Sequence, residues 1–122
     1  MPANLKELHC GYVSASESGD YFQVLFEGTQ DSDEGYLLVQ RQFEMSDAGK
    51  CYVETDDSDF TGHFRLRNAR LTRSQFEFEF GNRQTRKMKV SFTATDSAYG
   101  DVKRTLQIVI PDLDIPIKPT SF

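Results

Sequence analysis

The clearest structural signal in the sequence comes from two stretches: Gln75-Phe76-Glu77-Phe78-Glu79-Phe80, and Met-Lys-Val-Ser-Phe-Thr-Ala at 88–94. In both, apolar and polar residues alternate strictly, and residues 22–27 follow the same period except at Leu25. Successive side chains of a β-strand point to opposite faces of the sheet. A period of two therefore predicts half-buried strands, with one face on a core and the other in water. These stretches predict a β-rich domain whose core contains the alternating phenylalanines.

Less regular runs, rich in aromatic and β-branched residues, extend this pattern outward to 7–14, 36–43, 50–55 and 63–71. With the alternating stretches they make about seven strands. The turns between them are short and contain Gly, Asp and Asn, which favours antiparallel neighbours, because a parallel crossover needs a dozen residues or more. The sequence therefore predicts a meander-like antiparallel sheet.

One hairpin can be placed in detail. If Arg73-Ser74 is its two-residue loop, Leu71 lies opposite Phe76 on the core face, and Arg70 lies near Glu77 on the wet face. The apolar residues before this hairpin are out of phase with those inside it, which indicates a β-bulge or twist near 67–68.

The period changes once, after Asp96, which we expect to be a helix N-cap. Tyr99, Val102, Leu106 and Val109 recur at helical spacing, and Pro111 ends the pattern. Residues 108–110 could instead end a strand. Beyond them, 111–122 contains three prolines and predicts an extended tail along the domain or a partner.

The expected fold is α+β: a predominantly antiparallel sheet of about seven strands, one C-terminal helix packed on it, and an extended proline-rich tail. Because 122 residues suit one compact unit, we expect a single domain over 1–122, with its core at about 5–110.

The charge is divided unevenly along the chain. The net charge is −5, but residues 1–60 hold 13 acids and 3 bases, a net of −10, whereas residues 61–122 hold 6 acids and 11 bases, a net of +5. This division predicts either a polarised surface or two halves of one sheet that neutralise each other. No apolar run approaches the roughly 18 residues that cross a bilayer, and the start lacks a signal-peptide pattern, so we expect a cytoplasmic protein.

Candidate catalytic and metal-binding groups are few. Cys10 and Cys51 are expected to be free core thiols, and with His9 and His63 they are the whole Cys/His inventory, too sparse for a structural zinc site. The segment from Asp31 to Gly35 departs twice from the spacing of an EF-hand calcium loop. With no nucleophile elbow and no phosphate-binding loop, the sequence predicts no enzyme, no cofactor and no metal.

Residues 61–122 contain a pattern that is also found in nucleic-acid-binding sheets, because basic residues and phenylalanines occur on the same predicted strands. Such a sheet can bind single strands by phosphate contacts and stacking. The phenylalanines alternate with glutamates, however, which favours a buried face, and a pI of about 5.0 argues against nucleic acid.

Several segments together resemble the immunity protein 10 family of bacterial polymorphic toxin systems. They are Gly35-Tyr36-Leu37-Leu38-Val39-Gln40-Arg41, then Cys51-Tyr52-Val53-Glu54, the chain to Gly62, the hairpin from Arg70 to Phe80, the strand from Met88 to Phe92 and the helix with Leu106. The resemblance covers about residues 20–110. The chain lacks the glycine-rich character of the family around Gly62 and adds the proline-rich tail.

This resemblance implies a small cytoplasmic antidote that binds and blocks a cognate protein toxin without performing chemistry. A negative surface would speed its encounter with a basic toxin. Under this hypothesis the interface residues lie in the two acidic segments: Asp31, Asp33, Glu34, Asp56, Asp57 and Asp59.

Alternatives remain open at the level of sequence. The acidic segments can be solubilising loops without a partner. The domain can be a β-domain that binds a small ligand or nucleic acid, or, less in keeping with its residues, a small enzyme. We expect no membrane partner, and a monomer or a homodimer formed through an edge strand or the tail.

Overall fold

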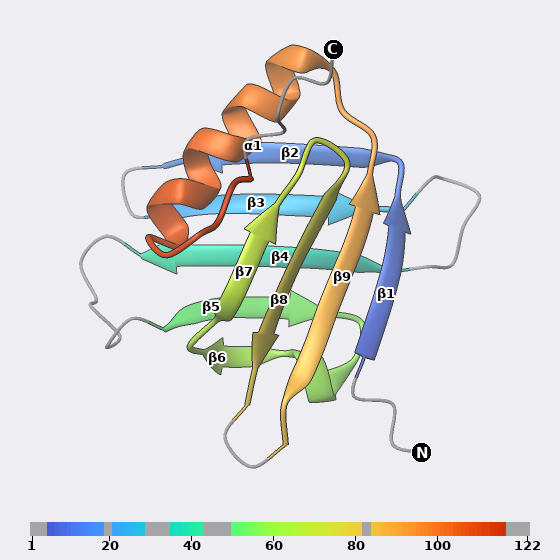
Figure 1. The fold of residues 1–122 in the computed structure, drawn as a ribbon, viewed down its shortest axis with the longest axis vertical. Helices are drawn as coiled ribbons and strands as arrows, with labels where there is room; N and C mark the ends of the chain where they lie inside the picture. The colour runs from blue at the N-terminus through green and yellow to red at the C-terminus, as the bar shows by residue number, and fades with distance from the viewer. Residues whose placement is uncertain (1–4, 19–20, 29–34, 43–49, 82–83, 117–122) are drawn as a thin grey trace.

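In the part of the chain that the structure describes, the fold has two β-sheet layers and one α-helix (Figure 1). The computed structural model describes residues 5–18, 21–28, 35–42, 50–81 and 84–116. One sheet has five strands in the order β2 (Tyr12–Glu17), β3 (Tyr21–Glu27), β4 (Tyr36–Gln42), β5 (Cys51–Thr55) and β6 (Gly62–Phe64). The other has four, in the order β1 (Leu5–Cys10), β9 (Arg86–Phe92), β8 (Gln75–Phe80) and β7 (Arg67–Leu71). A short 3-10 helix, η1 (Ser58–Phe60), and the α-helix α1 (Asp96–Val109) complete the elements.

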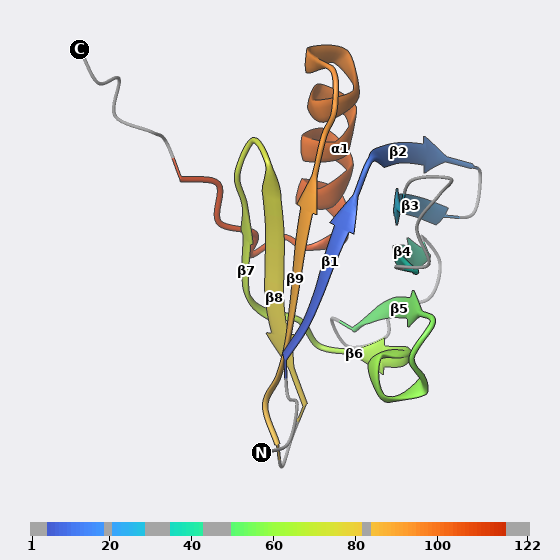
Figure 2. The same ribbon diagram turned by 90° about the vertical axis from the view of Figure 1, so that its right-hand side faces the viewer.

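The two sheets pack face to face, and their strands run across one another (Figures 1 and 2). The core between them comes from the alternating positions that the sequence predicts. Phe76, Phe78 and Phe80 are 0% exposed. The ring of Phe26, from the other sheet, stacks on Phe76 with centroids 5.6 Å apart. The prediction that these phenylalanines form a core is confirmed, and the alternative of an exposed stacking platform is wrong.

The fold class is confirmed as α+β with predominantly antiparallel strands, but the described residues form nine strands in two sheets. The runs 7–14 and 63–71 each contain two strands rather than one. The chain leaves one sheet and enters the other at Gly11, between β1 and β2, and at 65–66, between β6 and β7. Such corners are typical of sheets that pack across one another.

One strand pair departs from the antiparallel expectation: β1 pairs with β9 in parallel, with Leu8 opposite Val90. Short turns force antiparallel neighbours only between strands that are consecutive in sequence. β1 and β9 are far apart in the chain, so no short turn constrains their direction. Each sheet still contains a meander, β2 to β6 in one and β7 to β9 in the other.

The predicted hairpin is confirmed in register. Leu71 lies opposite Phe76 and Arg70 opposite Glu77, and the Thr72 N–H donates to the Gln75 carbonyl at 2.8 Å across the two-residue loop. The predicted bulge is also present. The register shifts between Arg67 and Arg70, and Asn68 adopts a φ of 51°.

The helix α1 buries the side chains of Val102, Leu106 and Val109, as its spacing predicts, and also Thr105. It packs on β2 and β3 and reaches β4. Its N-cap is Thr95 rather than Asp96. Thr95 is extended, and its hydroxyl accepts the Ala98 N–H at 3.1 Å, so Asp96 becomes the first helical residue. Residues 108–109 belong to the helix, and the chain turns at 111–112.

The first part of the tail lies along the domain, as expected. The Leu71 N–H donates to the Asp114 carbonyl and the Asp114 N–H donates to the Ala69 carbonyl, each at 2.9 Å, which places Asp114 beside the outer edge of β7. Leu113 and Ile115 pack against the core. The end of the predicted tail, 117–122, lies outside the described residues.

Candidate functional site

The outer surface of the five-stranded sheet has an unusual composition. Strand register and alternation place 13 of the described side chains on it, and we call this surface the tyrosine face. Its members are Tyr12, Ser14, Ser16, Tyr21, Gln23, Leu25, Glu27, Tyr36, Leu38, Gln40, Tyr52, Glu54 and His63. None of these residues is a lysine or arginine. Four of the five tyrosines of the chain lie here.

Glu54 is the most constrained residue of the tyrosine face. Its Oε2 accepts a hydrogen bond from the phenol of Tyr36 at 2.6 Å, and its Oε1 accepts one from the phenol of Tyr52 at 2.7 Å. Tyr36 comes from β4 and Tyr52 from β5, so two strands fix one carboxylate. These distances are typical of bonds to an ionised acceptor, which are shorter and stronger than neutral ones.

The protonation states agree with this geometry. The bonds from Tyr36 and Tyr52 lower the pKa of Glu54 below its ordinary value, because they stabilise the carboxylate. The bond to Glu54, with a smaller effect of burial, raises the pKa of Tyr36 to about 12. The separate bond from Tyr52 to Glu54 raises the pKa of Tyr52 in the same way. At neutral pH the site is therefore an anion held by two neutral phenols.

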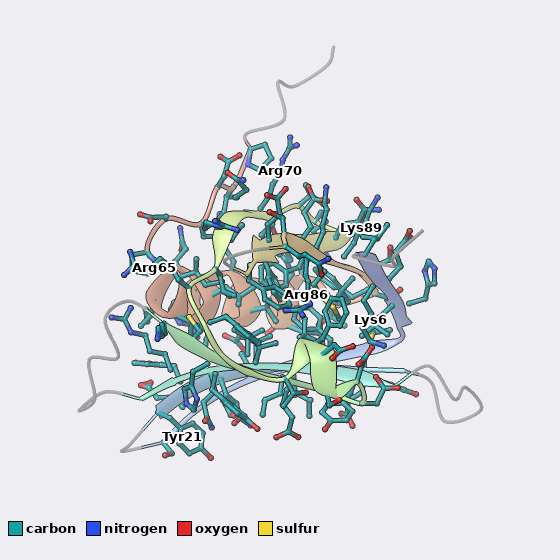
Figure 3. All side chains as sticks on the ribbon, turned by 90° about the horizontal axis from the view of Figure 1, so that it is seen from below. Lys6, Tyr21, Arg65, Arg70, Arg86 and Lys89 are labelled. Carbon is teal, nitrogen blue, oxygen red and sulfur yellow. The ribbon has the colours of Figure 1, made fainter. Side chains whose placement is uncertain are left out.

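Neighbouring contacts extend this ordered surface. The Tyr52 ring packs on the His63 ring with centroids 5.1 Å apart. Between β4 and β3, the Gln40 amide donates to the Gln23 side chain at 3.1 Å. Figure 3 shows Tyr21 on the opposite side of the molecule from Arg70 and Lys89, which belong to the four-stranded sheet. The tyrosine face therefore lies on the other side of the molecule from the four-stranded sheet.

The second acidic segment lies beside one end of the tyrosine face, between β5 and β6. Asp56 pairs with Lys6 of β1 at 3.3 Å and is 46% exposed. Asp57 caps η1 by accepting the Asp59 N–H at 2.9 Å, and the Asp59 side chain is exposed. Asp56 and Asp57 therefore have structural contacts, whereas the carboxylate of Asp59 points into solvent.

The first acidic segment contains Asp31, Asp33 and Glu34, which lie outside the described residues. Its last residue, Gly35, is described and lies against Asp56, so closely that an added Cβ would be 2.7 Å from the Asp56 carboxylate. The fold therefore brings the end of the first segment next to the second, although about 20 residues separate them in sequence.

The charge division of the sequence largely follows the two sheets. The acidic first half supplies β2 to β5 of one sheet, and the basic second half supplies β7 to β9 of the other. The exceptions are β6, which comes from the basic half, and β1, which comes from the acidic half. The halves therefore meet within a sheet where β5 pairs with β6 and where β1 pairs with β9, and there Glu7 lies opposite Lys89. Strands β7 to β9 also contain acidic residues that lie opposite their basic ones: Arg67 lies opposite Glu79, and Glu77 lies opposite Lys89.

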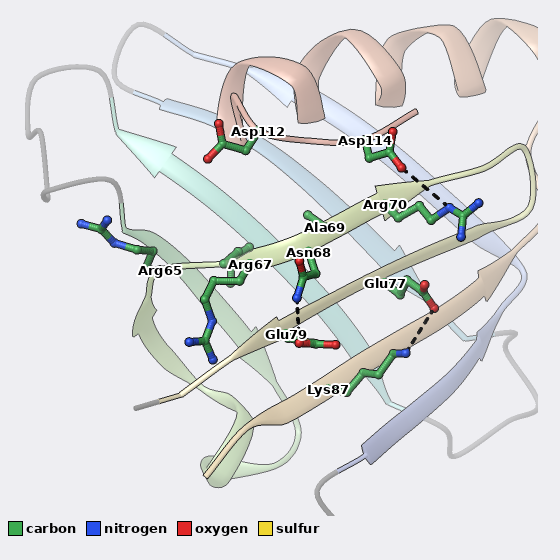
Figure 4. Close-up of a pocket in the computed structure, with 11 residues that line it drawn as sticks. Arg65, Arg67, Asn68, Ala69, Arg70, Glu77, Glu79, Lys87, Asp112 and Asp114 are labelled. Atoms are coloured by element: carbon green, nitrogen blue, oxygen red, sulfur yellow. Dashed lines mark hydrogen bonds and ion pairs between the residues drawn. The ribbon is translucent and has the colours of Figure 1, made fainter. Parts of the chain in front are cut away.

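A pocket of about 570 Å³ opens over β7 on this charged surface (Figure 4). Its wall carries both signs of charge in contact with each other. Arg70 lies 4.0 Å from Asp114, Lys87 lies 3.9 Å from Glu77, and the Asn68 amide donates to Glu79 at 3.0 Å. Because these groups compensate one another, the pocket presents no single charge to a ligand.

The thiols of the described chain are buried, whereas the imidazoles that would have to activate them are exposed. Cys10 and Cys51 are buried in the core, as predicted, and no disulfide joins them. Burial raises the pKa of Cys51 to about 11, and its thiol donates to the Val109 carbonyl at 3.3 Å. His9 is exposed on β1 and His63 on β6, in different sheets. Among the described residues no group of three His, Cys, Asp or Glu side chains is placed to bind a metal ion.

Sequence reasoning missed the tyrosine face as a candidate site. The sequence signal lies at the alternate positions of 36–40 and 52–54 that point away from the core. These positions hold Tyr, Leu, Gln and Glu rather than Lys or Arg. What sequence could not show is that Tyr36 and Tyr52, from different strands, meet on one carboxylate.

In the described part of the chain, no helix combines the length and apolar character that crossing a bilayer requires. Comparison with known proteins matched no family model, no curated protein and no solved structure.

Proposed function

We propose that this chain is a non-catalytic inhibitor that binds a protein toxin in the cytoplasm, with the tyrosine face and its acidic end as the binding surface. The observation that carries the proposal is the fixed carboxylate of Glu54 between the phenols of Tyr36 and Tyr52. The resemblance to the immunity protein 10 family supplies the class of partner.

The composition of the tyrosine face supports protein binding. Tyrosine is enriched in protein interfaces and lysine is depleted, because tyrosine offers a large contact area with few rotatable bonds. A surface already ordered by side-chain hydrogen bonds loses less conformational entropy when it binds. Tyr12, which is 58% exposed, adds apolar area at one edge of the face.

The charge of the surface supports a basic partner. The tyrosine face contains Glu27 and Glu54 without a lysine or arginine, and the exposed Asp59 lies in the turn after β5. A lysine or arginine of the toxin that approached Glu54 would meet an ionised carboxylate and two aromatic rings, which together favour a cation. In this proposal Asp31, Asp33 and Glu34 add long-range attraction.

The test uses the gene next to the one for this chain, which the proposal requires to encode the toxin. Expression of that gene alone should stop growth, and co-expression of this chain should restore it. The purified pair should form a complex whose affinity falls as salt rises. If the neighbouring product does not inhibit growth, or the two proteins do not bind, the assignment as a toxin inhibitor is wrong.

The site itself is tested with Glu54→Gln, which keeps the shape of the side chain and removes its charge. We expect the affinity to fall by about tenfold to a hundredfold, the range for loss of a hydrogen bond to a charged group. Asp59→Asn should mainly slow association. Glu77→Gln, on the outer surface of the other sheet, is the matched control and should bind as the parent does. Equal affinities for the Glu54 and Glu77 variants would exclude the tyrosine face as the interface.

A further inference from the structure

The free edge of β2 differs from the other edges of the two sheets. The edge of β7 is covered by Asp114, β6 has three residues, and β1 carries Lys6 and Glu7. Proteins commonly protect sheet edges by such covers, short strands and charges. β2 has six residues, Tyr-Val-Ser-Ala-Ser-Glu, with a single charge at its end and no proline. Among the described strands, only β3 pairs with it.

The hydrogen-bond pattern shows which backbone groups point to this edge. The Ser18 N–H donates to the Tyr21 carbonyl at 2.9 Å, in the same register that pairs Ser16 with Gln23. Residues of an antiparallel strand bond alternately to one side and the other. The even-numbered residues of β2 therefore bond to β3, and the N–H and C=O groups of Val13, Ala15 and Glu17 point outward.

The helix α1 lies beside this edge of the sheet. α1 packs on β2 and β3, and its N-terminal half extends past β2 in both views of the ribbon (Figures 1 and 2). Arg73 holds this end of the helix: its guanidinium donates to Asp96 at 2.9 Å and lies 4.7 Å from the centroid of the Tyr99 ring. A strand added to β2 would lie beside the helix on its inner side and would continue the tyrosine face on its outer side.

We propose that the edge of β2, beneath the overhanging end of α1, binds an extended segment of a partner protein as an additional strand. Backbone hydrogen bonds to Val13, Ala15 and Glu17 would provide the affinity, and alternate side chains would face the helix and the solvent. A second copy of this chain fits less well. Pairing β2 with itself about a twofold axis would place both α1 helices on the same side of the joined sheet. The N-terminal half of each helix extends past β2, so the two helices would compete for the same space.

The proposal does not depend on toxin inhibition and is tested without a toxin. The probe is an eight-residue synthetic peptide of alternating valine and threonine with lysine at each end. It is N-methylated along one edge so that it cannot associate with itself, and a twin methylated along both edges cannot pair at all. Titration of the ¹⁵N-labelled protein with the first peptide should shift the amide signals of Val13, Ala15 and Glu17 and slow their hydrogen exchange. The twin should leave them unchanged.

The variant Ala15→Pro removes an outward N–H without removing a bond to β3, and prolines are tolerated on such edges. It should weaken peptide binding at least tenfold, whereas Ala15→Ser, which keeps the N–H, should bind within about twofold of the parent. Three outcomes would each overturn the proposal. They are binding of the doubly methylated peptide, amide shifts confined to a strand other than β2, and undiminished peptide binding by the Ala15→Pro variant. Shifts of the same three amides with protein concentration alone would also overturn it, because they would identify the occupant as a second copy.

Discussion

The phenol of Tyr36 on β4 donates a hydrogen bond of 2.6 Å to Glu54 on β5, across the outer surface of the five-stranded sheet. This bond raises the pKa of Tyr36 to about 12, from an ordinary value of 10.0. The stability that the bond contributes is fully present below pH 10 and is lost as the pH rises towards 12, because ionisation removes the donor. Residue-resolved ¹³C NMR of the tyrosine rings should show this late titration. Glu54→Gln should bring it back towards 10, and Glu77→Gln should not.

The acid side of the same contact gives a second prediction. The phenols lower the pKa of Glu54, so their contribution to stability is present above the ordinary pKa of a glutamate and is lost as the pH falls through the lowered value. In the double variant Tyr36→Phe with Tyr52→Phe, the pKa of Glu54 should rise, as measured by NMR of its carboxyl carbon. Because the group is half-exposed, we expect about 1 kcal/mol or less of lost stability near neutral pH. An unchanged pKa would mean that the bonds are absent in solution.

The core predicts a strong contrast between adjacent residues of β8. Phe78 is 0% exposed, whereas Glu77 faces solvent beside Lys87. Phe78→Ala should lower the free energy of unfolding by about 3–5 kcal/mol, because it leaves a large cavity. Glu77→Ala should cost less than about 1 kcal/mol. Urea denaturation measures both, and similar losses for the two variants would contradict the assigned faces.

Two glycines predict effects of opposite sign. Gly35 has a φ of +80° and lies against Asp56, so Gly35→Ala should destabilise the fold by about 1–3 kcal/mol. Gly100 lies in α1 with no atom within 4 Å of an added Cβ, so Gly100→Ala should stabilise it by about 0.5–1 kcal/mol. Thermal unfolding of the two variants checks the signs. A stabilised Gly35→Ala would show that this backbone is not in the left-handed region.

The buried thiols predict low reactivity. With the pKa of Cys51 at about 11 and its Sγ donating to the Val109 carbonyl, few molecules carry the thiolate at pH 8. Ellman's reagent should therefore label neither Cys51 nor the buried Cys10 quickly in the folded protein, and should count both thiols in denaturant. Cys10→Ser isolates the signal of Cys51. Labelling of that variant at the rate of an exposed thiol would contradict the structure.

Much of the fold was predictable because its signals are local. Alternation at 75–80 identified the buried phenylalanines, and the same reasoning placed Leu71 opposite Phe76 and the bulge before them. The N-cap was misplaced by one residue, because Thr95 and Asp96 are both good caps and only the backbone conformation distinguishes them. The division of 7–14 and 63–71 into two strands each was also missed, because a corner between sheets leaves the residue types unchanged.

The residues alone predict which face of each alternating strand is buried and where the helix and hairpin form, because these features depend on side-chain period and on turns between neighbours in the chain. The tertiary structure was needed to show that β2 to β5 of the acidic half and β7 to β9 of the basic half lie in separate sheets, that β1 runs parallel to β9, and that Gly35 meets Asp56. It also brought Tyr36 and Tyr52 onto Glu54. Hydrophobic burial specifies which face of a strand points inward, but it does not specify which strand lies beside it. The choice of neighbour depends on how the two inner faces pack together, and this packing decides which outward side chains meet.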